Sequence, residues 1–154
     1  MTKQDKTKEH DYKAAQDWHE TVTEKYVLPL SKPTLFREAN SIKKLRDQVN
    51  ELNPNRNKVS DGTWGDMNHA NRDSDHNPWV INGNYGVVTA IDITHDLNLG
   101  INCELLAQSL VDSKDPRIKY IIWNSRMVSS YAKSDYDEWE WRDYNETVLN
   151  SVSK

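Results

Sequence analysis

Residues 74–78 read Ser74-Asp75-His76-Asn77-Pro78, and residues 86–96 read Gly86-Val87-Val88-Thr89-Ala90-Ile91-Asp92-Ile93-Thr94-His95-Asp96. In the second stretch the apolar side chains alternate with a period of two, which is typical of a β-strand. We therefore predict a strand over residues 86–93 that holds Asp92 on a rigid element, after a polar loop that carries His76. An imidazole and a carboxylate are two of the ligand types of a catalytic zinc ion, which normally takes three ligands from the protein.

The flanking sequence predicts a mixed fold. Six apolar residues at helical spacing predict a helix over residues 36–52 that ends at Asn53-Pro54: Phe36, Ala39, Ile42, Leu45, Val49 and Leu52. Residues 53–85 have no period and are rich in Asn, Asp, Ser and Gly, which is typical of a functional loop. Further on, Asn102 is the predicted N-cap of a helix that ends near Asp115-Pro116. Three more strands are predicted, over residues 117–123, 127–131 and 138–144.

This order of elements predicts an α+β domain, with a small, mainly antiparallel sheet and flanking helices, over residues 34–154. The first 33 residues differ in character. Within them, Ala15, Trp18, Val22 and Tyr26 recur every three or four positions, which predicts one amphipathic helix before the breaks at Pro29 and Pro33. We interpret residues 1–33 as an appended arm that docks on the domain or on a partner.

Composition excludes several classes of protein. The net charge is −4 and no basic run dominates any segment, so we expect no nucleic-acid partner. No apolar run approaches the roughly 18 residues that cross a bilayer, so we expect no membrane contact. The first 13 residues lack the apolar core of a signal peptide, so we expect no export signal. Cys103 is the only cysteine, which excludes an intramolecular disulfide. We expect Cys103 to pack as a small apolar residue on a helix.

Several motifs occur in an order that resembles a phage endolysin family. They are Leu45 to Asn50, Pro54-Asn55-Arg56, Ser60 to Thr63, Gly65-Asp66, His69-Ala70, Ser74 to Pro78, Val87 to Asp96, Asp115 to Tyr120 and Trp139 to Tyr144. Members of that family are similar to zinc D-alanyl-D-alanine carboxypeptidases and have the Hedgehog-like peptidase fold. The resemblance covers roughly residues 36–144 and implies zinc as the cofactor and bacterial peptidoglycan peptides as the substrate.

The resemblance also implies which residues bind the metal. A Ser-x-His motif maps the first zinc ligand onto His76, and a downstream aspartate maps the second onto Asp92. The family takes its third ligand from a His-x-His motif near the C-terminus, but no histidine follows His95 in this sequence. Leu149 and Ser151 occupy the places of those two histidines when the ends are aligned. His95 and His69 are the candidate substitutes for the third ligand, with shaping of the loops as their alternative role.

Other residues are candidates for catalysis and for binding the substrate. Glu138, Glu140 and Asp143 could act as a base, although acidic residues on an exposed strand are more often solvated charges. The aromatic residues Trp64, Trp79, Tyr85, Trp139 and Trp141 could line a groove or belong to the core and its rim. Arg72 and Arg142 could pair with a carboxylate of the substrate.

Two hypotheses follow from the resemblance. The first is an endolysin-like zinc metallopeptidase that cuts peptidoglycan peptides, located in the host cytoplasm until lysis or associated with the virion. The second is a catalytically inactive protein of the same fold. It would serve as a virion or tail component, or as a cell-wall-binding module, and the arm over residues 1–33 would contact other virion proteins.

Overall fold

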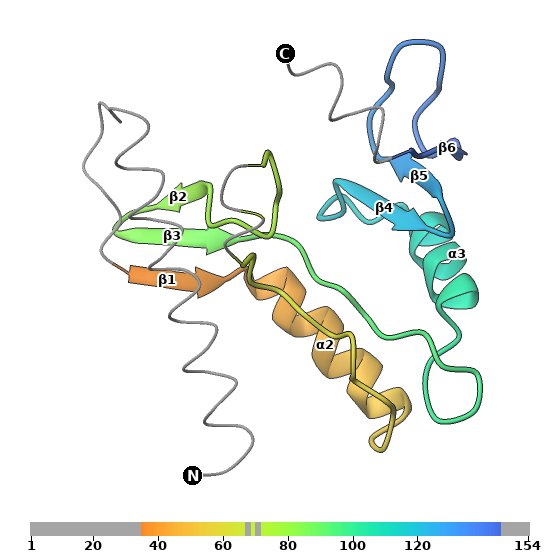
Figure 1. Cartoon of the computed structure of the whole chain (residues 1–154). Coiled ribbons are helices and arrows are strands. Elements are labelled where there is room, and N and C mark those ends of the chain that lie inside the picture. The colour runs from red at the N-terminus through yellow and green to blue at the C-terminus, as the bar shows by residue number, and fades with distance from the viewer. Residues whose placement is uncertain (1–34, 67–68, 70–71, 146–154) are drawn as a thin grey trace, which may run out of the picture. The chain divides into compact units, whose positions relative to one another are not determined.

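The computed structural model describes residues 35–66, 69 and 72–145. The first element within them is strand β1 (Leu35–Glu38). The described residues form two compact units, one made of residues 35–54 and 58–94 and the other of residues 55–57 and 95–145. Figure 1 labels the helices and strands of both. The predicted arm over residues 1–33 lies outside the described residues.

The first unit contains a three-stranded mixed sheet. Its strands lie in the order β1-β3-β2, with β3 (Tyr85–Val88) in the centre and β2 (Val80–Asn82) at one edge. β1 pairs with β3 in parallel, and β2 pairs with β3 antiparallel across a turn that contains Gly83 at φ 59°. Glycine adopts this left-handed conformation without a steric penalty, so the turn explains the tight hairpin.

Helix α2 (Asn40–Leu52) follows β1 and ends at the predicted position, with Asn53 as its C-cap. It buries Ile42 and Val49, while Lys43, Lys44 and Asp47 are exposed as its spacing predicts. The predicted start at Phe36 was wrong, because this residue belongs to β1. Gly86 has no side chain, and a Cβ there would lie 3.0 Å from Phe36 Cδ1, so the Phe36 ring packs closely over the central strand.

The predicted strand over residues 86–93 is shorter than expected and ends at Val88. The neighbouring strand β1 ends at Glu38, and the Ala39 amide donates the last bond of this ladder to the Val88 carbonyl over 2.9 Å. Residues beyond Val88 bond instead to the loop that follows α2. β2 was not predicted at all, because three residues are too few to give a recognisable alternation.

The second unit contains helix α3 (Cys103–Ser113) and an antiparallel sheet. The sheet is formed by β4 (Tyr120–Trp123), β5 (Arg126–Ser129) and β6 (Arg142–Asp143), in this order. Each overlaps one of the three predicted strands; β4 and β6 lie within the predicted bounds, and β5 begins one residue earlier and ends two residues earlier than predicted. The core consists of Cys103, Ala107 and Val111 from the helix and Val128 from β5.

Two sequence predictions for α3 are confirmed. Asn102 is its N-cap, and the side-chain oxygen accepts hydrogen bonds from the amides of Glu104 and Leu105. Cys103 is buried and 6% exposed. The helix ends at Lys114, whose left-handed φ of 46° closes the last turn just before the predicted stop at Asp115-Pro116.

The described residues therefore have the predicted α+β composition, with two helices and two three-stranded sheets, one mixed and one antiparallel. Neither described helix has the length and apolar character needed to cross a bilayer.

Candidate functional site

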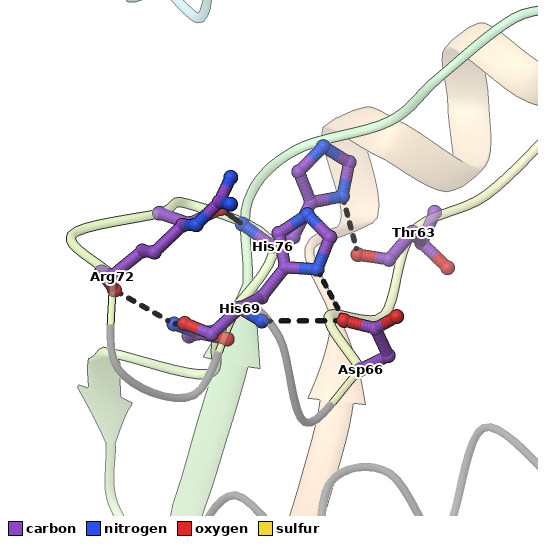
Figure 2. Close-up of polar contacts among 7 residues, drawn as sticks. Thr63, Asp66, His69, Arg72 and His76 are labelled. Atoms are coloured by element: carbon purple, nitrogen blue, oxygen red, sulfur yellow. Dashed lines mark hydrogen bonds and ion pairs between the residues drawn. The ribbon is translucent and has the colours of Figure 1, made fainter. Parts of the chain in front are cut away.

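His76 lies in the loop before β2, and its ring is fixed by a backbone contact. Nδ1 lies 2.9 Å from the carbonyl oxygen of Thr63. Figure 2 draws this contact as a dashed line. A carbonyl oxygen can only accept, so Nδ1 carries the proton in this contact and Nε2 of the neutral ring keeps its lone pair. Its side chain is 20% exposed. Histidines that bind metals are commonly oriented by such a contact at the other ring nitrogen.

Asp92 is held by an isolated antiparallel bridge to Gly62. Its amide donates to the Gly62 carbonyl over 2.7 Å, and the Gly62 amide donates to the Asp92 carbonyl over 3.3 Å. The carboxylate side chain is 64% exposed. The neighbouring residues are also linked, because the Asp61 carboxylate accepts hydrogen bonds from the amide and from the hydroxyl of Thr94, each over 2.8 Å. The backbone around Asp92 is thus fixed while its carboxylate remains accessible.

These two elements bring the predicted metal ligands together. His76 Nε2 lies 3.6 Å from Asp92 Oδ1. This distance is too long for a good hydrogen bond but short enough for a strong electrostatic interaction. The interaction with the Asp92 carboxylate raises the pKa of His76 above its usual value, while partial burial acts in the opposite direction. The Thr63 carbonyl and the Asp75 carboxylate raise the same pKa further.

Asn77 secures the loop on which His76 lies. It is 1% exposed, and its amide nitrogen donates to the carbonyls of His69 over 2.8 Å and of Arg72 over 3.1 Å. Gly65 lies against the same group, and its amide donates to the His76 carbonyl over 2.8 Å. A Cβ at Gly65 would lie 2.6 Å from Asn77 Oδ1, so this approach requires a glycine.

Of the two candidate substitutes for the third ligand, His69 belongs to the same unit as His76 and Asp92. Its ring centroid lies 5.8 Å from that of His76, and Figure 2 shows both imidazoles in the same loop region. Its Nδ1 is 2.7 Å from Asp66 Oδ1, and its amide also bonds to this carboxylate. Asp66 therefore orients the ring of His69.

His95 belongs to the second unit, where it has a different role. Its Nδ1 accepts a hydrogen bond from the Cys103 amide over 3.1 Å at the start of α3. Its ring lies against Trp123 with centroids 4.9 Å apart. His95 therefore contacts the first residue of α3 and a residue of β4.

The three candidate bases also belong to the second unit and are exposed. Glu140 Oε2 accepts a hydrogen bond from the Asp137 amide over 2.8 Å, so it closes a turn. Asp143 lies on β6 opposite Arg126. Glu138 precedes Trp139, which has a left-handed φ of 61° and donates its amide to the Ser129 carbonyl. No contact singles out one of the three as a base.

The predicted groove residues are divided between the two units. Trp64, Arg72, Trp79 and Tyr85 lie in the first unit, where Trp64 is half-buried and the other three are exposed. Trp139, Trp141 and Arg142 lie in the second and are half-buried. Arg126 stacks over the Trp141 ring at 4.9 Å.

Arg142 has a more specific environment than the other groove residues. Its Nη2 donates to Ser129 Oγ over 2.6 Å and approaches Met127 Sδ at 3.0 Å. Its Nη1 is buried and has no hydrogen-bond partner in the described part of the chain.

The positions of His76 Nε2 and Asp92 Oδ1 fit part of a zinc site. Two donors on a tetrahedral zinc, each about 2.0 Å from the ion, lie about 3.3 Å apart, so His76 Nε2 and Asp92 Oδ1 fit two positions. Within residues 35–66, 69 and 72–145, no group of three His, Cys, Asp or Glu side chains is arranged to hold a metal ion. Leu149 and Ser151 lie outside the described residues.

Sequence reasoning found the two chemical groups but missed the residues that position them. Thr63, Gly62, Gly65, Asp66 and Asn77 act through backbone atoms, close packing or a short side-chain contact. Their positions in the quoted motifs were visible, but a backbone carbonyl such as that of Thr63 leaves no signal in residue type. Gly65 next to Asp66 in a polar loop was the one visible sign of a close approach.

Comparison with known protein families, curated proteins and solved structures finds no match for this chain.

Proposed function

We propose that this chain is an endolysin-like metallopeptidase that acts on the peptides of bacterial peptidoglycan, with His76 and Asp92 as two zinc ligands. The finer fold that goes with this proposal is the Hedgehog/DD-peptidase fold implied by the sequence resemblance. The α+β composition of the described residues agrees with such a fold.

One observation carries the metal site, namely the distance of 3.6 Å between His76 Nε2 and Asp92 Oδ1. A simple surface ion pair would not need a second contact that fixes the orientation of the imidazole ring. Here the Thr63 carbonyl accepts from Nδ1, which leaves the lone pair of Nε2 available to a metal ion beside the Asp92 carboxylate. A backbone contact of this kind is the usual support of a histidine that binds a metal.

The residues of the chain have separate tasks in this proposal. The bridge between Gly62 and Asp92 fixes one ligand, and the loop held by Asn77 fixes the other. A bound zinc ion would supply a water of lowered pKa and polarise the scissile carbonyl. Trp64, which follows Thr63, and Trp79, which follows the His76 loop, would contact the peptide or glycan beside the ligands. Arg72 in the same loop would pair with a carboxylate of the substrate.

A second function is favoured by the incomplete ligand set. Because the described residues contain no group of three suitable side chains, the metal would have to complete its shell with water or another ligand. A protein that has lost its third ligand would keep the fold and serve as a virion component or a cell-wall-binding module. His69 would then shape the loop, through its contacts with Asp66 among others.

Zinc titration of the purified chain distinguishes these functions. For the metallopeptidase we expect one zinc ion per chain by calorimetry and elemental analysis, with affinity reduced at least tenfold in His76→Ala and in Asp92→Asn. His10→Ala, outside the residues that carry the resemblance, is the matched control and should bind zinc like the wild type. Absence of zinc binding in a well-folded wild type would exclude the metal site.

Activity is tested separately on purified peptidoglycan. We expect release of peptides that stops after chelation and resumes with added zinc. A chain that binds peptidoglycan in a pull-down but releases nothing supports the second function. In that case the double substitution Leu149→His with Ser151→His should restore cleavage if only the third ligand is missing.

A further inference from the structure

One face of the sheet in the first unit carries a cluster of partly exposed apolar residues. Pairing in the sheet places Leu35, Tyr85 and Asn82 in one row, and Arg37, Val87 and Val80 in the next, all on the same face. Partners in a ladder point to the same side, and Arg37 does lie over the Tyr85 ring at 5.6 Å. We call the apolar part of this face, formed by Leu35, Val80 and Tyr85, the sheet patch.

The sheet patch is unusually exposed for apolar strand residues. Leu35 is 49% exposed, Val80 48% and Tyr85 39%, whereas Val87 between them is only 4% exposed. The hairpin over residues 79–85 contains no charged residue, although 29% of the whole chain is charged. Exposed apolar residues that cluster on strands at a sheet edge mark a surface that another segment covers.

We propose that the sheet patch is the docking site of the amphipathic segment over residues 11–26 of the same chain. Thirty-four residues precede Leu35, and Leu35 itself belongs to the patch, so the covalent connection delivers the segment to this face. The eight residues 27–34 can span about 25 Å when extended, which reaches any point of a small sheet.

The sequence of the segment fits this site. Ala15, Trp18, Val22 and Tyr26 form one apolar stripe, whereas Asp17, Glu20 and Glu24 lie on the opposite side of the predicted helix. A helix of 16 residues spans about 24 Å and is marginally stable alone in water, so it requires a surface on which to fold. The short tether raises its effective concentration at the patch above that of any second molecule.

Cysteine cross-linking tests this proposal on the full chain. Cys103 is the only native cysteine and is buried, so it is replaced by alanine to give a clean background. Val80→Cys is then combined with Ala15→Cys or Val22→Cys on the stripe, and with Glu20→Cys or Glu24→Cys as controls. The controls have nearly the same tether length as Val22, so a segment that is not docked reacts equally at all of these positions.

We expect the stripe positions to form intramolecular disulfides, or links through a short thiol-reactive reagent, at least ten times faster than the controls. Adding Trp18→Asp to the Val22→Cys and Val80→Cys pair should abolish this difference. Equal rates would overturn the proposal, and so would links mainly between two chains, which indicate a second copy on the patch. Faster linking of Val80→Cys to Leu149→Cys would also overturn it, because the C-terminal segment would then be the occupant.

Hydrogen exchange supplies a readout that does not depend on cysteine. In the otherwise native chain, Trp18→Asp should increase the exchange of the β2 and β3 amides at least tenfold, while α3 in the second unit stays unchanged. Unchanged exchange in β2 and β3 would contradict docking at this face. Neither measurement involves a metal, so the result is separate from the proposed peptidase function.

Discussion

Gly62 and Asp92 exchange two backbone hydrogen bonds, although each lies outside the named strands. This bridge sets the position of a carboxylate whose side chain is largely exposed. Since a Cβ at Gly62 would lie 3.8 Å from the nearest atom, Asp92 Oδ2, the bridge does not require a glycine at this position. Gly62→Ala is therefore a suitable control for more crowded positions.

Gly65→Ala should destabilise the first unit by about 1–3 kcal/mol, because the added Cβ overlaps Asn77 Oδ1 and lies 2.9 Å from His69 Cβ. Gly62→Ala should change the free energy of unfolding by less than about 0.5 kcal/mol. Urea denaturation followed by circular dichroism measures both. Equal effects of the two substitutions would contradict the close packing at Gly65.

Asn77→Ala should cost about 1–3 kcal/mol, since it removes the two hydrogen bonds from the buried side-chain amide to the carbonyls of His69 and Arg72. Asn82→Ala, in the exposed strand β2, is the matched control and should be nearly neutral. Denaturation curves give the stabilities, and NMR spectra should report altered His69 and His76 ring signals in Asn77→Ala alone. Unchanged ring signals would show that Asn77 does not help to position the His76 ring.

In metal-free protein, His76 should titrate above the usual pKa of a histidine, and Asp92→Asn should lower this pKa. A raised pKa in the folded state stabilises the protein below the pKa of the unfolded chain, and this contribution is lost as the pH rises through the folded-state pKa. The stability difference between wild type and Asp92→Asn should therefore be larger in mild acid than at alkaline pH. NMR titration of the imidazole signals checks the first point and denaturation at several pH values the second.

Glu38 should be the carboxylate whose protonation weakens the first unit in acid. Burial alone would raise its pKa, but the hydrogen bonds from Arg46 and Thr63 outweigh this effect and lower the pKa. A lowered pKa gives stability that is present above the unfolded-state value and is lost as the pH falls through the folded-state value. Glu38→Gln should cost about 1–3 kcal/mol at neutral pH and flatten this acid dependence. Exposed Glu51→Gln is the control, and matching acid profiles for the two variants would refute the assignment.

Asn102→Ala should destabilise α3 by about 1 kcal/mol, because the side-chain oxygen accepts from two amides of the first turn. Asn102→Asp should retain most of the stability, since a carboxylate accepts the same bonds. Thermal unfolding and amide exchange within residues 103–106 check this prediction. Loss of protection confined to another element would show that the cap is not the cause.

The structural features that could be predicted are those marked in the sequence by a long or chemically distinct pattern. The capped helix at Asn102 and the end of α2 at Asn53 were both predictable, because capping and proline effects act locally. Phe36 was assigned to a helix because its spacing to Ala39 and Ile42 fits one. Its actual place in β1 depends on parallel pairing with Gly86, which is distant in the sequence.

The two candidate ligand residues could be predicted from the sequence, but the residues that hold them in place could not. His76 and Asp92 were found from residue type, and the structure brings their side chains together. The shorter strand β3 means that Asp92 is positioned by a single bridge rather than by a continuous ladder. The roles of Thr63 and Gly62 rest on main-chain atoms that every residue has, so no sequence pattern could reveal them.

The order of pairing in the two sheets has a consequence for how the chain folds. β4 and β5 are joined by a two-residue turn at Asn124 and Ser125, both with the positive φ that such hairpins need, so this pairing closes over a short loop. β1 and β3 instead pair in parallel across a long intervening segment, and loop closure of that kind is slow. We expect the hairpin in the second unit to form early and the approach of His76 to Asp92 to come late in folding. If His76 and Asp92 bind a metal ion as proposed, adding the ion during refolding should therefore change the folding rate little and should mainly slow unfolding.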